Sequence, residues 1–239
     1  MNDIHLNTYL GQPIHITPTH RIQCSSCKKW VKKLFRMGCC YPCFYSSPLA
    51  SPCIISPEKC QAHLGIGRDM EWETTHHLSP QIVYLSYTSH VKVGVTQASN
   101  IPSRWIDQGA LNAIIVCETP NRYIAGCIEV LLKSYFHDKT FWKKMLCCAE
   151  PLSSLHESKR EALSYLSDYS DYISSNDTDY TFSYPFVKQP TKITSSLSLD
   201  ACDDFRDTLI GMKGQYLFFE SGIVFNINKY IGHELSFHF

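Results

Sequence analysis

The sequence has no excess of either charge and no long hydrophobic run. Lys and Arg total 22, and Asp and Glu also total 22. Balanced charge creates no long-range field that would attract nucleic acid or an anionic membrane, so a partner of that kind must be bound by a local patch. No segment approaches the roughly 20 apolar residues of a membrane-spanning helix. No internal repeat is evident either, which argues against a solenoid or an array.

The first residues also lack the pattern of a secretory signal. The segment MNDIHLNTYLGQPIHI has no basic stretch followed by an apolar one, so we expect no signal peptide and a cytoplasmic location. A reducing compartment disfavours a dense disulfide framework for the twelve cysteines. Metal binding and simple burial then remain as the explanations for these cysteines.

Four of the cysteines form two pairs with the spacing of zinc ligands. Twelve residues separate Cys24-x-x-Cys27 from Cys40-x-x-Cys43, and each pair can present two thiolates to one ion from a tight turn. Four thiolates complete a tetrahedral shell with no open position, so the expected zinc is structural rather than catalytic. The alternative is coincidental burial of four cysteines, which is disfavoured because so short and basic a segment has little else to hold it together.

A second set of ligand types follows with less regular spacing. Cys53, Cys60 and His63 supply three of them, and His76 or His77 would supply the fourth. The sequence leaves open whether these residues bind a second zinc or whether the cysteines are core residues and the histidines are exposed. The cysteines beyond residue 100 lack paired spacing, and we expect them to act as small hydrophobic side chains.

A local basic patch lies inside the first cysteine pattern. The run KKWVKKLFR places Trp30 and Phe35 among five basic side chains, which are Lys28, Lys29, Lys32, Lys33 and Arg36. This interleaving suits contacts with a nucleic-acid backbone combined with base stacking. We therefore expect DNA or RNA as the partner, a protein partner as the alternative, and no membrane contact.

The order of periodicities predicts an α+β protein in three parts. We expect β strands and the Cys-rich zinc module in residues 1–78, a small sheet with flanking helices in 79–150, and a helix, an acidic linker and β strands in 151–239. Between residues 81 and 146 the predicted order is strand, strand, short helix, strand, long helix, helix. The C-terminal residues predict a hairpin and a third strand, and these strands could pair with the N-terminal ones.

The stretch IVYLSYTSHVKVGVT, residues 82–96, predicts a β hairpin with an apolar side for the core and an open side that could carry chemistry. In its second strand the valines point to one face, and Lys92, Gly94 and Thr96 point to the other. Glycine weakens a strand interior unless something approaches the backbone closely. We expect that a helix or a substrate does so at Gly94.

The order of elements over about residues 81–137 resembles the GIY-YIG nuclease fold. Tyr84 matches the tyrosine of the first motif half, and Lys92 and Gly94 fall on the second half. Arg104 matches the arginine of the family's helix, and Glu129 matches its metal-binding glutamate. Nearly the whole chain, including YPC, RWIDQGA and KGQYL, also resembles an uncharacterised bacterial family in which a Cys-rich segment precedes a GIY-YIG-like core.

The resemblance implies a divalent-metal-dependent phosphodiesterase, that is, an endonuclease. Glu129 would hold Mg²⁺ or Mn²⁺, Arg104 would stabilise charge on the phosphate, and Tyr84 or Lys92 would stand near the attacking water. Gly94 and the basic residues of segment 28–36 would contact the substrate. The sequence departs from the family because Lys92 replaces the second motif tyrosine, and a lysine acts as a general base only where its pKa is lowered. The glycine before residues 82–84 is missing, and no residue is assigned to a later asparagine.

Two other functions therefore stay open. One is a zinc-stabilised nucleic-acid-binding module with a degenerate, non-catalytic site, and the other is a surface for a protein partner. Each predicted site residue also fits an ordinary structural role. Glu129 could pair with Lys133 at i+4, Arg104 with a neighbour on its own helix, and Tyr84 could simply pack within a strand.

Overall fold

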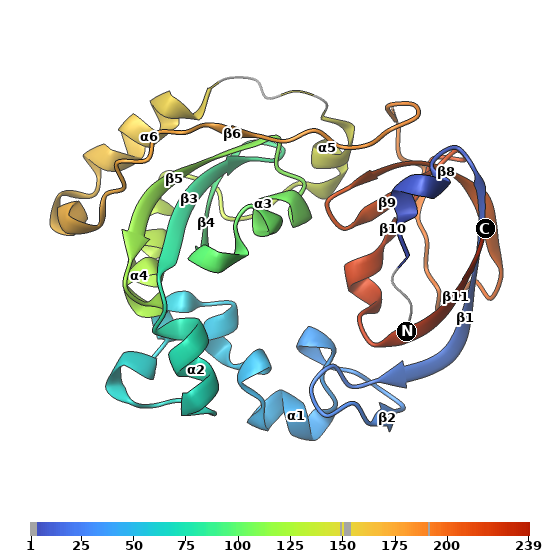
Figure 1. Cartoon of the computed structure of the whole chain (residues 1–239), viewed down its shortest axis with the longest axis horizontal. Helices are drawn as coiled ribbons and strands as arrows, with labels where there is room; N and C mark the ends of the chain where they lie inside the picture. Colours follow the sequence, from blue (N-terminus) through green and yellow to red (C-terminus); the bar gives the residue numbers. More distant parts are fainter. Residues whose placement is uncertain (1–3, 149, 151–153, 191) are drawn as a thin grey trace. The chain divides into compact units, whose positions relative to one another are not determined.

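The structure is a computed structural model that describes residues 4–148, 150, 154–190 and 192–239. The chain forms two compact units. The first unit comprises Met1–Phe44 and Ser183–Phe239, and the second comprises Tyr45–Phe182. The chain thus leaves the first unit near the end of its Cys-rich segment and returns to it with the C-terminal strands (Figure 1). The division at residues 78 and 150 that the sequence suggests stays a prediction.

The first unit is built on a sheet in the order β11-β1-β8-β9-β10-β7, with β2 paired to β1. Its strands are β1 Pro13–Gln23, β2 Trp30–Val31, β7 Ser195–Ser196, β8 Phe205–Lys213, β9 Tyr216–Phe219, β10 Ile223–Asn226 and β11 His233–His238. β1 lies between β8 and β11, so the expected pairing of C-terminal with N-terminal strands is confirmed. Alternate residues Ile14 and Ile16 of β1 enter a core that also contains Leu209, Phe219 and Phe225.

Strand β8 was missed by the sequence interpretation, whereas the C-terminal hairpin was predicted. The hairpin is β9–β10, which turns at the ESG sequence, and the third strand is β11. β8 contains a register shift between Leu209 and Gly211 in its pairing with β9. The buried residues of β8, which are Phe205, Leu209, Gly211 and Lys213, still fall on one face. Because two of them are glycine and lysine, the sequence lacks the apolar period of two that identifies a strand.

The second unit contains an antiparallel sheet in the order β4-β3-β5-β6. Its strands are β3 Gln81–Tyr87, β4 Val91–Gln97, β5 Asn112–Thr119 and β6 Tyr180–Thr181. The helices of the chain are α1 Tyr41–Ser46, α2 Met70–His77, α3 Ser103–Asp107, α4 Arg122–Leu132, α5 Trp142–Cys147 and α6 Leu155–Ser164. Figure 1 shows α3 on one side of the sheet and α6 on the other, and all of β3 is buried. Within the described ranges, no helix has both the length and the apolar character needed to cross a bilayer.

Short 3-10 turns connect these elements. They are η1 Leu6–Tyr9, η2 Arg36–Gly38, η3 Pro48–Ala50, η4 Pro52–Ile54, η5 Pro57–Lys59, η6 Ala62–Leu64, η7 Ala98–Asn100, η8 Ser167–Tyr172 and η9 Ile227–Tyr230. The acidic linker expected within residues 151–239 corresponds to the stretch that follows α6, from residue 167. It is irregular for most of its length but also forms η8 and the edge strand β6.

The element order predicted between residues 81 and 146 is confirmed as β3, β4, α3, β5, α4, α5. α3 follows Pro102, and Gly109 adopts a φ of +71° just beyond its end. α4 begins at Arg122. Its cap is Asn121, whose side-chain oxygen accepts a hydrogen bond from the backbone N–H of Ile124 at 3.0 Å. The α+β class predicted from the sequence is thereby confirmed.

Candidate functional site

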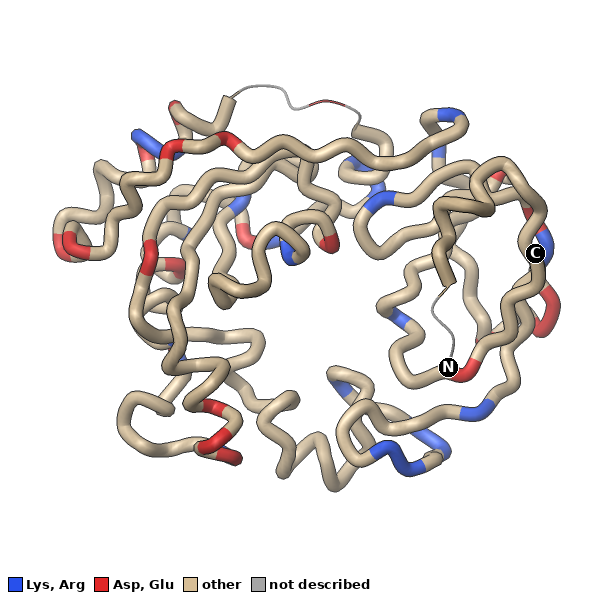
Figure 2. The backbone as a smooth tube through the Cα atoms, viewed as in Figure 1, with Lys and Arg blue, Asp and Glu red and all other residues tan. Residues whose placement is uncertain are grey.

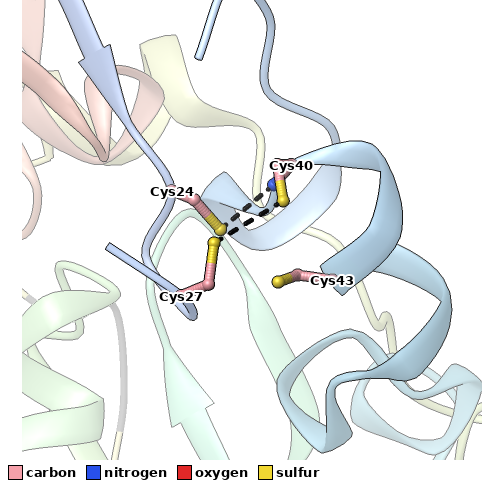
Figure 3. Close-up of side chains that lie close together, drawn as sticks. All are labelled: Cys24, Cys27, Cys40 and Cys43. Atoms are coloured by element: carbon pink, nitrogen blue, oxygen red, sulfur yellow. Dashed lines mark hydrogen bonds between the residues drawn. The ribbon is translucent and has the colours of Figure 1, made fainter. Parts of the chain in front are cut away.

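The first cysteine pattern folds into one compact group of thiols, drawn in Figure 3. The Sγ atoms of Cys24, Cys27, Cys40 and Cys43 all lie within 4.8 Å of one another. The Sγ atoms of Cys27 and Cys40 are 3.8 Å apart. Two thiolates that each lie about 2.3 Å from one tetrahedral ion are about 3.8 Å apart, so the spacing fits zinc. The predicted ligand set is brought together and could hold a structural metal ion.

The backbone prepares Cys24 to act as a thiolate. Its side chain is buried, and its Sγ accepts a hydrogen bond from the backbone N–H of Cys40 at 3.2 Å. Burial raises the pKa of this thiol, but the N–H groups of Cys40, Cys27 and Ser26 outweigh burial and lower the pKa to about 6. Cys39 is outside the group, and its Sγ lies 3.8 Å from Oγ of Ser25.

Exposed basic side chains occupy the segment between Cys27 and Cys40. They are Lys28, Lys29, Lys32, Lys33 and Arg36, and Figure 2 shows the basic positions along the segment around β2. Trp30 is 48% exposed, and the guanidinium carbon of Arg21 lies 4.0 Å from the centroid of its ring. The sequence contains no acidic residue from position 4 to position 57. The chain is neutral as a whole, yet every Lys, Arg, Asp or Glu residue in this stretch is a Lys or Arg.

A second group of metal donors lies in the other unit. One donor atom each from Cys53, Cys60, Glu73 and His77 lies within 4.8 Å of the others, and all four residues are buried. Nδ1 of His77 is 3.9 Å from Sγ of Cys53 and 3.4 Å from Oε2 of Glu73. Tetrahedral zinc with its usual bond lengths gives about 3.6 Å for the first pair and about 3.4 Å for the second. This group too could hold a structural metal ion.

Hydrogen bonds and packing hold the second group in place. The contact with Cys60 lowers the pKa of Cys53 to about 4, against the effect of burial, and the same contact raises the pKa of Cys60. Oε1 of Glu73 accepts from the backbone N–H of Arg68 at 2.8 Å. A Cβ at Gly67 would lie 2.5 Å from the carboxyl carbon of Glu73, so a larger residue at position 67 would have to displace this carboxylate.

The composition of the second group differs from the one predicted. His63 stacks on Tyr123, with ring centroids 4.5 Å apart, and is outside the group. His76 stacks on Trp72 at 3.9 Å and is also outside it. His77, the other histidine that the sequence offered as fourth ligand, is in the group, and Glu73 takes the place of His63. Glu73 and His77 are four residues apart on α2 and therefore share one face of the helix. Sequence reasoning missed Glu73 because it did not predict this helix.

A third constellation brings together residues from β3, β4, α3 and α4. Tyr84 pairs with Gly94, and Ser86 pairs with Lys92, so Tyr84 and Lys92 share one face of the sheet. Lys92 is only 7% exposed. Burial lowers its pKa to about 8, the charge of Arg104 acts in the same direction, and Glu129 and Asp138 oppose it. Lys92 is therefore within electrostatic reach of both the guanidinium of Arg104 and the carboxylate of Glu129.

We call Tyr84, Lys92, Arg104 and Glu129 together the sheet site, and its tyrosine is the most deeply buried member. Tyr84 is fully buried, and its hydroxyl donates a hydrogen bond to Oε1 of Gln108 at 3.2 Å. Burial raises the pKa of the phenol, the charge of Arg104 opposes this, and Glu129 adds to it. The close approach expected at Gly94 is made by this phenol, because a Cβ there would lie 2.7 Å from Oη of Tyr84. The expectation of a helix or a substrate at that point is corrected accordingly.

Glu129 and Arg104 differ in their surroundings. Glu129 is 8% exposed, and Nζ of Lys133 lies 3.2 Å from its Oε2, so the i+4 pair suggested by the sequence is present. Burial raises the pKa of Glu129, and Lys133 opposes this. Arg104 is exposed on α3. Its position leaves the guanidinium accessible to a ligand.

These features define an α+β protein that carries two groups of donors suited to structural metal ions. The chain belongs to the family described as "Protein of unknown function (DUF2797)", whose model matches residues 11–235. No curated protein and no solved structure matches the chain.

Proposed function

We propose that this protein binds nucleic acid and hydrolyses phosphodiester bonds at the sheet site. The observation that carries the proposal is the buried Lys92, whose pKa is lowered to about 8 and which lies within electrostatic reach of Arg104 and Glu129. A buried cation destabilises a fold unless it is compensated, and groups with strongly shifted pKa values concentrate at functional sites. The GIY-YIG-like order of β3, β4, α3, β5 and α4 supports the same proposal.

The side chains divide the reaction among them. Lys92 loses its proton as the pH rises through about 8, and its neutral amine accepts a proton from the attacking water. Arg104 presents the paired N–H donors that match phosphate oxygens and stabilise the charge that develops on them. The phenol of Tyr84, held by Gln108, stays protonated because burial raises its pKa, so it orients the site and does not act as a base.

Glu129 suits a divalent cation. Mg²⁺ and Mn²⁺ prefer oxygen donors and are often bound through one or two carboxylates, with waters and substrate oxygens as further ligands. A cation held by Glu129 would supply Lewis-acid polarisation of the scissile phosphate. Lys133, 3.2 Å from Oε2, balances the charge of this carboxylate in the structure described here.

The basic segment of the first unit supplies the affinity for nucleic acid in this proposal. Its exposed lysines neutralise phosphates, and Trp30, 48% exposed, offers a ring on which a base can stack. Such contacts do not depend on the base sequence of the nucleic acid. They suit DNA and RNA alike.

The test is cleavage of supercoiled plasmid and of labelled single-stranded RNA with added Mg²⁺ or Mn²⁺. Wild-type protein is expected to nick at least one substrate, and Glu129→Ala is expected to abolish the activity. Glu157→Ala, which removes an exposed carboxylate on α6, is the control and should cleave at the wild-type rate. Equal cleavage by Glu129→Ala and wild type contradicts the proposal.

A second candidate is a binding module without catalysis, favoured by the ion pair between Glu129 and Lys133. It predicts binding that weakens steeply with salt and no cleavage with either cation. Absence of nucleic-acid binding even at low salt would select a protein partner instead.

A further inference from the structure

A short backbone segment, residues 53–60, joins the second group of metal donors to helix α4. We call this segment the wedge. Cys53 lies in turn η4, and Cys60 directly follows turn η5. The backbone of η5 packs so closely on α4 that a Cβ at Gly126 would overlap the backbone of Pro57 and Glu58. The segment 53–60 is therefore held by the donor group at both of its ends and pressed against the helix in between.

An arginine ties the start of the same helix to the same segment. Arg122 is the first residue of α4. Its Nε donates to the backbone oxygen of Cys53 at 2.9 Å, and its Nη2 donates to the backbone oxygen of Ile54 at 2.9 Å. Two charge-assisted hydrogen bonds in a fork geometry fix orientation as well as distance. The position of the Cys53 backbone thus sets the position of the helix start.

The contacted face of α4 is the face that carries Glu129. Arg122, Gly126 and Glu129 are spaced i, i+4 and i+7, which places them along one side of the helix. Glu58, from the wedge, also raises the pKa of Glu129 by its charge, which agrees with their closeness. A shift of the wedge would therefore change the position and surroundings of the Glu129 carboxylate.

We propose that a zinc ion held by Cys53, Cys60, Glu73 and His77 fixes helix α4 and thereby the position of Glu129. Two thiolates, one imidazole and one carboxylate at tetrahedral spacing are donors that zinc accepts. Without a cation these buried acidic groups repel one another, and segment 53–60 loses the closure that holds it against α4. Glu129 is then a residue whose placement depends on zinc bound elsewhere. The catalytic role of Glu129 rests on the function proposed above. The coupling between zinc and helix α4 is independent of that function.

The experiment combines elemental analysis with hydrogen exchange on the full-length protein. Wild type is expected to contain two equivalents of zinc, and Cys60→Ser is expected to contain one. In Cys60→Ser the backbone amides of α4 should exchange about tenfold faster than in wild type, because the helix opens locally at lower cost. Cys127→Ser removes a cysteine on α4 outside the donor group, so it should keep both zinc ions and the wild-type exchange rate.

Two further variants separate coupling from general unfolding. Cys24→Ser should also lose one equivalent of zinc, but α4 should exchange at the wild-type rate because Cys24 lies in the other compact unit. Gly126→Ala should keep both zinc ions and still exchange faster in α4, because the added Cβ displaces the wedge. Should Cys60→Ser itself fail to fold, Gly126→Ala still tests whether the contact between the wedge and α4 slows hydrogen exchange in this helix.

The outcomes distinguish this inference from the proposed function. Full zinc content in Cys60→Ser overturns the inference, and so does loss of zinc with unchanged exchange in α4. Zinc-dependent exchange without any cleavage of nucleic acid upholds the inference and removes the proposed function. Cleavage by a Cys60→Ser protein whose α4 amides exchange at the wild-type rate overturns the inference and supports the proposed function.

Discussion

The phenol of Tyr84 on β3 fills the space left by the missing side chain of Gly94 on β4. A Cβ at Gly94 would lie 2.7 Å from Oη and 2.8 Å from Cζ of Tyr84. The two residues are direct partners in the antiparallel register. The glycine is therefore required by a buried tyrosine, and the tyrosine in turn lies beside Arg104 of α3 and beside Gln108, the residue that follows this helix.

Gly94→Ala is expected to destabilise the protein by about 1–3 kcal/mol, because the added methyl group overpacks the sheet face. The loss should be smaller in a Tyr84→Phe background, which removes the nearest of the clashing atoms. Urea unfolding of the four proteins in this double-mutant cycle gives the coupling free energy. An equal cost of Gly94→Ala in both backgrounds would show that the phenol does not set the glycine requirement.

The buried Lys92 should make stability depend on pH in a defined window. Its pKa is about 8 in the folded protein and ordinarily 10.5, so between these values the unfolded chain binds more protons than the folded one. The free energy of unfolding therefore rises with pH across this window, and the destabilising effect of the buried charge is fully present below pH 8.

Lys92→Met should remove this rise and leave the protein at least as stable as wild type at pH 7. The gain is no more than about 3 kcal/mol, the value of the pKa shift taken at face value. Chemical unfolding at a series of pH values measures it, with Lys143→Met, an exposed lysine on α5, as the control. A lower stability of Lys92→Met at pH 7 would mean that the lysine is held by a stabilising ion pair.

Metal removal should affect the two compact units separately. Cys24→Ser is expected to lose one equivalent of zinc and to loosen the Cys-rich part of the first unit, because folding and metal binding are coupled in such modules. Cys39→Ser, which changes the neighbouring buried cysteine outside the group, should retain all of its zinc. Elemental analysis with limited proteolysis follows both effects. A fully folded Cys24→Ser protein with the zinc content of wild type would contradict the assignment.

The basic segment should determine how binding depends on salt. Lys32→Gln together with Lys33→Gln is expected to lower the slope of log K against log salt by about 2 for duplex DNA, since each phosphate contact contributes about 0.9. Lys188→Gln together with Lys192→Gln removes the same charge from exposed positions outside the segment and should leave the slope unchanged. Identical slopes for the two pairs would mean that nucleic acid binds elsewhere.

The sequence predicts features that depend on local spacing and fails where distant segments decide. The cluster of four thiols from Cys24 to Cys43 follows from two short chelating turns. The order of elements from 81 to 146 follows from the strong periodicity of apolar residues. The second donor group depends on α2 meeting segment 53–60, which no spacing reveals. The sequence therefore offers His63 where the structure has Glu73, and it leaves the choice between His76 and His77 open.

The sheet site shows the same limit in another form. A motif resemblance can name Lys92, Arg104 and Glu129, but only the fold shows that the lysine is buried and that its pKa is lowered. Burial is a property of the packed elements around a residue and not of the residue's neighbours in the sequence. The role of Tyr84 against Gly94 likewise depends on strand register, which one sequence does not give.

The dependence of the cleavage rate on pH tests the central claim, that Lys92 acts as the base beside Arg104 and Glu129. Under single-turnover conditions with Mg²⁺ or Mn²⁺, the wild-type rate should rise with pH and level off above an inflection near 8, where Lys92 becomes neutral. Lys92→Met should cleave about 10²- to 10⁴-fold more slowly and lose this inflection. No cleavage at any pH, or a Lys92→Met protein with the rate and inflection of wild type, would contradict the account.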